Sequence, residues 1–239
     1  MDLDIIIPVY NEAELIQITL EKLRSVKFPE HIEKVKIIVV DDSSTDNSAE
    51  QINEYLRSAK AKEQEIVFLQ LDRNLGKGAA VRHGMDNSSG DLILIQDADL
   101  ELTPQDIPSM LEAQQKLGVE FVNGSRYLPG IPRPLSSYRR YIANRFMTWL
   151  TSILINVKLT DMACGYKLFT RNLYKQLNLR ENGFGIEAEI IIKAMRIRKN
   201  NITEVPVNYF PRNKGEGKKI SIVDGFRILG TIIKYSIFR

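Results

Sequence analysis

The feature that most constrains the fold is a regular alternation of short apolar runs with longer amphipathic segments. Each run is rich in β-branched residues, which favour strands. The runs occupy residues 3–9, 35–40, 66–71, 92–96 and 119–123. The segments between them have the spacing of helices, among them residues 76–85 and a segment that begins at Thr103-Pro104. Apolar strands that alternate with helices predict an α/β fold, with a mostly parallel sheet and helices on both faces.

Polar residues follow each apolar run at the point where the predicted strand ends. In a parallel α/β sheet, ligands bind beyond the carboxyl ends of the strands. The clusters are Tyr10-Asn11-Glu12, Asp41-Asp42, Arg73-Asn74 with Gly76-Lys77, Asp97-Ala98-Asp99, and Gly124-Ser125-Arg126. We therefore expect one binding site at this edge of the sheet.

Two of these clusters also carry the signals of a helix start. Asn11, followed three residues later by Glu14, predicts a capped helix that begins there. The polar residues 41–46 suit a turn and a second helix cap. Each of these strands is therefore expected to lead directly into a helix.

Three carboxylates occupy alternate positions after the run at 92–96, namely Asp97, Asp99 and Glu101. If the chain stays extended, their side chains project towards a common point. They would then repel one another unless a cation lies among them. Oxygen ligands favour a hard ion such as Mg²⁺ or Mn²⁺. Acidic residues at a helix N-terminus would need no metal, and the pattern alone leaves both explanations open.

Side chains in the neighbouring clusters can serve a nucleotide. Glu12 and Asp42 can accept hydrogen bonds from a base or ribose, and Lys77 and Arg126 can balance phosphate charge. Taken singly, Glu12 is better explained as part of a first helical turn and Lys77 as a solvated side chain. Gly76-Lys77-Gly78 lacks the spacing of a P-loop or a dinucleotide fingerprint, which excludes an NTPase and a dehydrogenase.

The pattern loosens after Tyr127. A proline-rich loop precedes a predicted helix at 137–157, a short strand at 166–169, a helix at 186–198, an edge strand at 202–209 and a last helix from 222. The helices at 137–157 and 222–239 are amphipathic and carry basic residues. They can lie in a membrane interface or pack against the core, and we expect partial membrane contact for the first.

Charge, cysteine content and hydropathy narrow the classes of protein. A net charge of +3 gives no reason to expect a nucleic-acid partner. The single cysteine, Cys164, excludes an internal disulfide and fits a reducing compartment. The amino terminus has no signal-peptide pattern, and no apolar run reaches the roughly 20 residues that span a bilayer. We expect a peripheral protein on the cytoplasmic face of a membrane.

Ordered motifs give the chain a family resemblance. They are Pro8-Val9-Tyr10-Asn11-Glu12, Val40-Asp41-Asp42-Ser43-Ser44-Thr45-Asp46, Asn74-Leu75-Gly76-Lys77-Gly78, Asp97-Ala98-Asp99 and Gly124-Ser125-Arg126. In this order and spacing they resemble the inverting glycosyltransferases of family 2, which have the Rossmann-like GT-A fold. The resemblance covers nearly the whole chain and implies a single GT-A domain, 1–239. Its donor half would be 1–126, and its acceptor and membrane-interface half 127–239.

Within this family, the chain looks like the polyprenyl-phosphate hexose synthases, the group of dolichyl-phosphate mannose and glucose synthases. The supporting motifs are Cys164-Gly165-Tyr166-Lys167-Leu168-Phe169, Gly183-Phe184-Gly185-Ile186-Glu187, and Tyr209-Phe210-Pro211-Arg212 followed by Gly215-Glu216-Gly217-Lys218. Two departures leave the sugar open. Mannose synthases commonly have glutamine in place of Glu101 and serine in place of Gly217.

The resemblance also implies residue roles. The positions that hold the nucleoside are Pro8, Tyr10, Glu12, Val40 and Asp42, and those of the metal and diphosphate site are Asp97, Ala98, Asp99 and Glu101. The implied metal ligands are Asp97, Asp99 and Glu101. Arg126, Arg212 and Lys218 match groups that contact the donor diphosphate or the reacting region. Arg139 and Arg140 fall where an arginine engages the acceptor phosphate, although a solvated helix start explains them equally well. The residues expected to act in catalysis are Asp99, Arg126, Arg140, Arg212 and Lys218.

The implied reaction is a metal-dependent transfer of mannose or glucose, from GDP-mannose or UDP-glucose to a polyprenyl phosphate. Neither His31 nor His83 lies in an acid–base cluster, and a phosphate acceptor needs no base because it is already ionised. The implied partners are the sugar nucleotide, the lipid phosphate, the membrane surface and a membrane-anchored protein. One rival is transfer to a glycan or soluble hydroxyl, with a base among Asp161, Glu187 and Glu189. The other is a sugar-nucleotide-binding module without turnover.

Overall fold

The computed structural model describes residues 1–58, 65–132, 134, 137–198, 201–212 and 221–237. Its strands are Asp2–Val9 (β1), Lys34–Asp41 (β2), Glu65–Gln70 (β3), Leu92–Ile95 (β4), Phe121–Ser125 (β5), Lys167–Thr170 (β6) and Ile202–Pro206 (β7). Its helices are Ile16–Arg24 (α1), Ser48–Arg57 (α2), Lys77–Asp86 (α3), Ile107–Leu117 (α4), Tyr138–Ile155 (α5), Arg171–Leu177 (α6), Ile186–Ile197 (α7) and Ile222–Ile237 (α8). A 3₁₀ turn, Pro104–Asp106 (η2), precedes α4.

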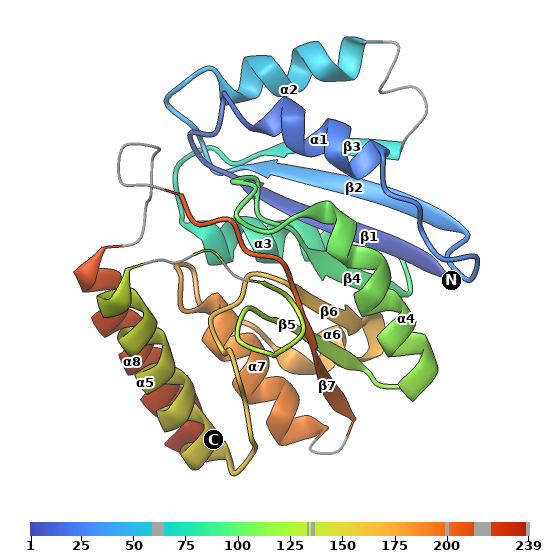
Figure 1. The fold of residues 1–239 in the computed structure, drawn as a ribbon. Helices are drawn as coiled ribbons and strands as arrows, with labels where there is room; N and C mark the ends of the chain where they lie inside the picture. The colour runs from blue at the N-terminus through green and yellow to red at the C-terminus, as the bar shows by residue number, and fades with distance from the viewer. Residues whose placement is uncertain (59–64, 133, 135–136, 199–200, 213–220, 238–239) are drawn as a thin grey trace.

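The strands form one sheet in the order β3-β2-β1-β4-β6-β5-β7 (Figure 1). β6 runs antiparallel to β4 and β5, and the other neighbouring pairs are parallel. β1 is central, with Ile6 opposite both Ile38 of β2 and Ile95 of β4. The chain therefore winds outwards on both sides of β1, which leaves a crevice at the carboxyl ends of β1 and β4. The predicted mostly parallel α/β sheet is confirmed.

Two apolar layers pack against the sheet because alternate strand residues point to opposite faces. On one face, Ile5 and Val39 pack with apolar residues of α1, α2 and α4. On the other, Ile6 and Ile38 pack with α3, α6 and α7. Each fully buried aliphatic side chain contributes about 1.5–3 kcal/mol relative to an exposed one. The two layers hold the strand ends, and the loops that follow them, in fixed positions.

The predicted helix start at Asn11 was wrong, since α1 begins at Ile16. Asn11 instead adopts a left-handed conformation with φ of 52°. Its side-chain carbonyl accepts a hydrogen bond of 2.7 Å from the backbone N–H of Thr45. The polar residue that resembled a cap thus ties the loop after β1 to the loop after β2.

Two elements differ from expectation in the second half of the chain. Helix α6 was not predicted, because its seven residues are too few to show a helical period. The edge strand predicted at 202–209 ends at Pro206, and Tyr209 pairs instead with Leu102 in an isolated bridge. The chain after β7 therefore crosses towards the loop that follows β4.

Helices α5 and α8 lie side by side at one side of the molecule (Figure 1). α8 buries Ile232 in the layer beside α7, whereas α5 buries only Thr148 and Thr151 among its residues. The packing of α8 against the core agrees with one of the two explanations given for it above, and much of α5 remains apolar and exposed. In the described part of the chain, no helix combines the length and the apolar character needed to cross a bilayer.

Candidate active site

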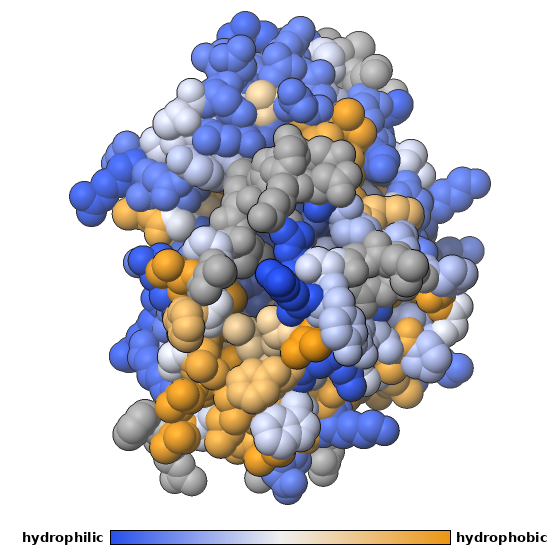
Figure 2. Space-filling model, turned by 60° about the vertical axis from the view of Figure 1, so that its left-hand side comes forward, coloured by the Kyte–Doolittle hydropathy of each residue, from blue (hydrophilic) through white to orange (hydrophobic). Residues whose placement is uncertain are grey.

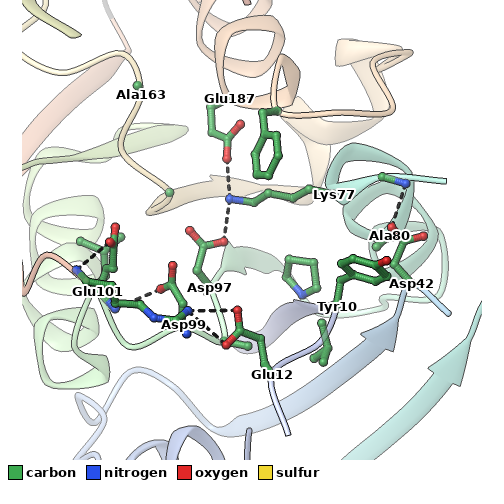
Figure 3. A pocket seen from close by; sticks show the side chains of 18 of the residues that line it. Tyr10, Glu12, Asp42, Lys77, Ala80, Asp97, Asp99, Glu101, Ala163 and Glu187 are labelled. Atoms are coloured by element: carbon green, nitrogen blue, oxygen red, sulfur yellow. Dashed lines mark hydrogen bonds and ion pairs between the residues drawn. The ribbon is translucent and has the colours of Figure 1, made fainter. Parts of the chain in front are cut away.

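A pocket of about 490 Å³ lies at the carboxyl ends of the central strands. That volume is within the range of small-molecule sites. The predicted site residues that line it are Pro8, Tyr10, Glu12, Asp42, Lys77, Asp97, Ala98, Asp99, Glu101, Arg126 and Arg212. Side chains that the sequence predicted for one site, from loops far apart in the chain, thus lie around one pocket. Figure 3 shows most of them around one cavity.

Three of the predicted residues are placed elsewhere or are not described. Val40 is fully buried in the core layer beside α3 and does not line the pocket. Arg140 lies in the first turn of α5 and also does not line it. Lys218, together with Gly217, lies outside the described residues.

Lys77 lies between two carboxylates of the pocket wall (Figure 3). Its Nζ is 2.7 Å from Oδ1 of Asp97 and 2.6 Å from Oε1 of Glu187. Burial alone would lower the pKa of Lys77, but the two negative charges raise it above the ordinary value. The prediction that Lys77 is a solvated surface side chain is therefore wrong. Lys77 joins the end of β4 to the first turn of α7.

The chain does not stay extended after β4. The prediction that Asp97, Asp99 and Glu101 project towards a common point assumed an extended chain, and that assumption was wrong. Residues 98–101 form a turn, and Leu100 has φ of 56°. Within that turn, the backbone N–H of Glu101 donates a 3.0 Å hydrogen bond to Oδ1 of Asp99. Burial raises the pKa of Asp99 to about 7, with further contributions from the charges of Asp97 and Glu101. The turn therefore brings the carboxylates of Asp97, Asp99 and Glu101 close enough to influence one another.

Asp97 and Asp99 offer oxygen ligands of the kind that a hard divalent cation takes. Asp97 also pairs with Lys77, and Glu101 is engaged by other groups. The hydroxyl of Tyr209 donates to Oε2 of Glu101 at 3.1 Å, and the backbone N–H of Arg212 donates to Oε1 at 2.9 Å. In the described ranges, no three Asp, Glu, His or Cys side chains form a group arranged to hold a metal. The raised pKa of Asp99 marks negative charge that a cation would offset. The three-ligand set stays a prediction.

Arg126 is held by Asp161, a residue from the loop before β6. Nε and Nη2 of the guanidinium donate to the two carboxylate oxygens at 2.7 and 2.8 Å. Burial alone would raise the pKa of Asp161, but the charge and hydrogen bonds of Arg126 hold it below its usual value. The guanidinium also lies 5.1 Å from the ring centroid of Tyr209, within cation–π range. Arg126 thus lines the pocket as half of a buried ion pair.

Glu12 and Asp42, the predicted nucleoside ligands, both have protein partners. One Nη of Arg212 lies 3.1 Å from each carboxylate oxygen of Glu12. Asp42 accepts hydrogen bonds of 2.7 and 2.8 Å from the backbone N–H groups of Leu75 and Gly76. Burial raises the pKa of Asp42, and the two N–H groups oppose that shift. Asp42 therefore also fixes the turn that leads into α3.

The three candidate bases of the rival reaction differ in their access to the pocket. Asp161 is fully buried against Arg126. Glu189 is also fully buried and accepts hydrogen bonds from the backbone of Arg180 and Glu181. Glu187 alone of the three lines the pocket.

From the loop before β6, sequence reasoning gave a chemical role only to Asp161, as a candidate base of the rival reaction, and it assigned no role to Gly165. Gly165 lies against Asp97, so closely that a Cβ added at Gly165 would be 2.2 Å from Oδ2 of that carboxylate. The buried ammonium of Lys167 donates to the carbonyl of Cys164 at 2.6 Å and to Asn123 at 2.6 Å, which fixes the loop. The one signal in the sequence was the glycine at position 165. The reason that a glycine is required there is recognised only once the position of Asp97 is known.

The sequence model described as "Glycosyl transferase family 2" matches residues 4–177. This span contains β1 from its third residue, the strands from β2 to β6, and the turn that carries Asp97 and Asp99.

Curated relatives cover most of the chain. A dodecaprenyl-phosphate galacturonate synthase of Rhizobium johnstonii is 28% identical over 100% of this chain and 67% of its own length. An undecaprenyl-phosphate mannosyltransferase of Micrococcus luteus is 28% identical over 89% of this chain and 85% of its own. An undecaprenyl-phosphate 4-deoxy-4-formamido-L-arabinose transferase of Yersinia enterocolitica is 30% identical over 90% of this chain and 61% of its own.

Solved structures share the fold. Glucosyl-3-phosphoglycerate synthase from Mycobacterium tuberculosis, in complex with Mn²⁺ and UDP-glucose, superposes with a TM-score of 0.72. The alignment covers 98% of this chain and 79% of that one, at 15% identity. The same enzyme with UDP gives a TM-score of 0.71. At this identity the likeness concerns the fold alone, which is the GT-A fold expected above.

Proposed function

Because the chain belongs to glycosyl transferase family 2, we propose that it transfers a hexose from a nucleoside-diphosphate sugar to a polyprenyl phosphate at a membrane surface. One observation carries the proposal: the three relatives described above are all named for sugar transfer to a polyprenyl phosphate. Their sugars differ, so the comparisons leave the donor open. We assign most of the donor site, in particular the nucleoside and the metal site, to residues 1–126, and the acceptor to residues 127–239.

The surroundings of the pocket support a lipid acceptor. Ile228 of α8 lines the pocket, and α8 contacts α5. Exposed apolar side chains on these helices form what we call the apolar platform: Tyr138, Ile142, Phe146, Trp149, Ile153, Val223, Phe226, Ile233 and Ile237. Figure 2 shows apolar residues gathered on the lower part of this face. A surface of this kind, beside basic residues such as Arg145 and Arg227, suits a bilayer interface.

The residues of the pocket provide the chemistry of an inverting transfer. Asp97 and Asp99 would hold Mg²⁺ or Mn²⁺, and a cation bound there would supply charge stabilisation for the departing diphosphate. Lys77 and Arg212 add positive charge to the same wall, where it opposes the charge that develops on the leaving group. The acceptor phosphate attacks the anomeric carbon, the bond to the nucleoside diphosphate breaks, and the configuration inverts. No protein base is required, because the acceptor phosphate is ionised at neutral pH.

Product analysis with a donor panel tests the proposed reaction. The protein is incubated with polyprenyl phosphate, Mg²⁺ or Mn²⁺, and radiolabelled UDP-glucose, UDP-galactose and GDP-mannose. We expect label in the organic phase from one donor, with the loss of that label when EDTA is added. A parallel reaction with soluble glycans replaces the lipid. Transfer to a glycan alone would favour the hydroxyl-acceptor reaction, and nucleotide binding without transfer would favour a binding module.

Truncating two residues of the apolar platform is expected to weaken membrane binding. Trp149 and Phe226 are 58% and 71% exposed. Burying one large apolar side chain contributes about 1.5–3 kcal/mol. The double variant Trp149→Ser/Phe226→Ser should therefore bind anionic vesicles at least about a hundredfold more weakly in a sedimentation assay.

The matched control for the platform is Leu117→Ser, on α4. Leu117 is 57% exposed but lies outside the platform. This variant should bind vesicles as the unchanged protein does. Equal binding of the platform variant and the control would contradict the assignment of this face to the membrane.

A further inference from the structure

We propose that Glu187 selects a neutral sugar and excludes a donor whose sugar carries a carboxylate. The inference deepens the proposed function, since it assumes that the pocket holds a sugar nucleotide. Of the sugars in the names of the relatives, galacturonate is anionic, whereas mannose and formamido-arabinose are neutral. The argument uses the position of Glu187, the charges around it and its hydrogen-bonding capacity.

The position of Glu187 corresponds to the sugar end of a donor. In Figure 3, Glu187 lies across the cavity from Glu12, with Lys77 and Asp97 between them. A donor with its nucleoside beside Glu12 and Tyr10, and its diphosphate at Asp97, must continue towards Glu187. Ala163 and Phe184, which carry no polar side-chain atoms, also line the pocket, and Figure 3 shows Ala163 on the same side of the cavity as Glu187. Glu187 is the carboxylate that faces this part of the cavity.

The charges of the described lining oppose an additional anion. It contains six carboxylate side chains, Glu12, Asp42, Asp97, Asp99, Glu101 and Glu187, and three cationic ones, Lys77, Arg126 and Arg212. Each of these three cations already pairs with a carboxylate. Lys77 is shared by Asp97 and Glu187, Arg126 is held by Asp161, and Arg212 is held by Glu12. A sugar carboxylate would therefore meet Glu187 without a spare cation among the described residues.

Two features hold Glu187 in this place. It lies in the first turn of α7, where the helix dipole favours a negative charge. Lys77 also contacts it at 2.6 Å. An ionised carboxylate accepts hydrogen bonds but donates none. Hydroxyl groups of a neutral hexose can therefore donate to it, in charge-assisted bonds that are stronger than neutral ones.

Calorimetric binding of matched donors tests the inference without requiring an acceptor. The probes are the pairs UDP-glucose and UDP-glucuronate, UDP-galactose and UDP-galacturonate, and GDP-mannose and GDP-mannuronate, all with Mn²⁺. Within the pair whose nucleotide and sugar configuration the protein prefers, we expect the neutral donor to bind at least about a hundredfold more tightly. In Glu187→Gln this ratio should fall at least about tenfold, because the repelling charge is removed and the size is kept.

Two further variants make the test specific. Glu187→Asp keeps the charge, so it should still exclude the uronate while binding the neutral donor more weakly. Glu112→Gln removes an exposed carboxylate of α4 and should leave the ratio unchanged. Thermal melting of each variant checks that it folds. If Glu187→Gln does not fold, the ratio of neutral-donor affinity to uronate-donor affinity in Glu187→Asp decides whether the charge at this position excludes the uronate.

The outcomes separate this inference from the proposed function. A wild-type protein that binds the uronate equally well or better would overturn it, and so would an unchanged ratio in Glu187→Gln. Discrimination in binding combined with no transfer to polyprenyl phosphate would leave the inference standing and contradict the proposed reaction. If neither member of any pair binds, both are contradicted.

Discussion

Replacing Asp99 with asparagine is expected to lower the rate of hexose transfer about a thousandfold, the effect typical of removing a group that stabilises charge in the transition state. Asp99 lines the pocket, and its half-buried carboxylate lies close enough to Asp97 and Glu101 for their charges to raise its pKa. In the proposed reaction, the diphosphate that leaves the sugar needs positive charge beside it, and Asp99 is one of the two proposed ligands of the cation that would supply this charge. Asparagine keeps the size of the side chain and weakens that binding.

The rate measurement is accompanied by measurements of cation binding and stability. Mn²⁺ affinity, followed by electron paramagnetic resonance, should fall with the rate. The free energy of unfolding of the metal-free protein should stay the same or rise, since the uncharged asparagine side chain is not repelled by the two neighbouring carboxylates. Glu101→Gln serves as the comparison, with an expected loss below about tenfold, because Tyr209 and Arg212 hold Glu101. Near-normal transfer by Asp99→Asn would refute the metal role.

Replacing Asp161 with asparagine is expected to have the largest effect on stability, a loss of about 3–5 kcal/mol in the free energy of unfolding. This is the cost of leaving a buried charge without its partner. The carboxylate of Asp161 is fully buried and holds Nε of Arg126 at 2.7 Å. Asparagine offers one acceptor oxygen and no charge to a guanidinium that stays buried. Urea denaturation of the wild-type protein and of Asp161→Asn at pH 7.5 gives the difference between their free energies of unfolding.

The pH dependence of this difference follows from the sign of the pKa shift. The pKa of Asp161 is lower in the folded protein than its unfolded value of 3.8. The ion pair therefore contributes fully above about pH 3.8 and loses its contribution as the pH falls through the lower, folded-state pKa. The gap between the wild-type protein and Asp161→Asn should narrow in that acid range. The variant Arg126→Met/Asp161→Asn, which removes both charges, should recover part of the loss. A loss below about 1 kcal/mol at pH 7.5 would contradict the assignment.

The sequence was sufficient to predict the sheet and the edge of the sheet at which the pocket lies. Short apolar runs between polar residues, such as residues 92–95, favour buried strands, and parallel strands place their carboxyl ends together. Clusters such as Asp97-Ala98-Asp99 could therefore be brought to one edge without coordinates. The predicted position of α1 failed at Asn11 because a side chain that caps a helix can equally stabilise a left-handed turn.

The pairing of charges within the site could not be predicted from the sequence. Lys77 and Glu187 are far apart in the chain, and so are Arg126 and Asp161, yet each pair is in direct contact. Such contacts depend on how helices and loops dock in three dimensions, and no local pattern encodes them. The sequence offered Glu187 only as one of three candidate bases of the rival reaction, and its contact with Lys77 in the pocket became visible in the structure.

The reversed strand β6 has a consequence for dividing this protein into modules. It belongs to the half of the chain assigned to the acceptor, yet it lies between β4 and β5, which belong to the half assigned to the donor. Because it runs antiparallel, its amino end meets the carboxyl ends of its neighbours, and so the loop with Gly165 reaches Asp97. Donor and acceptor specificities of two relatives therefore cannot be recombined by a crossover near residue 126 without also exchanging a strand from the middle of the sheet.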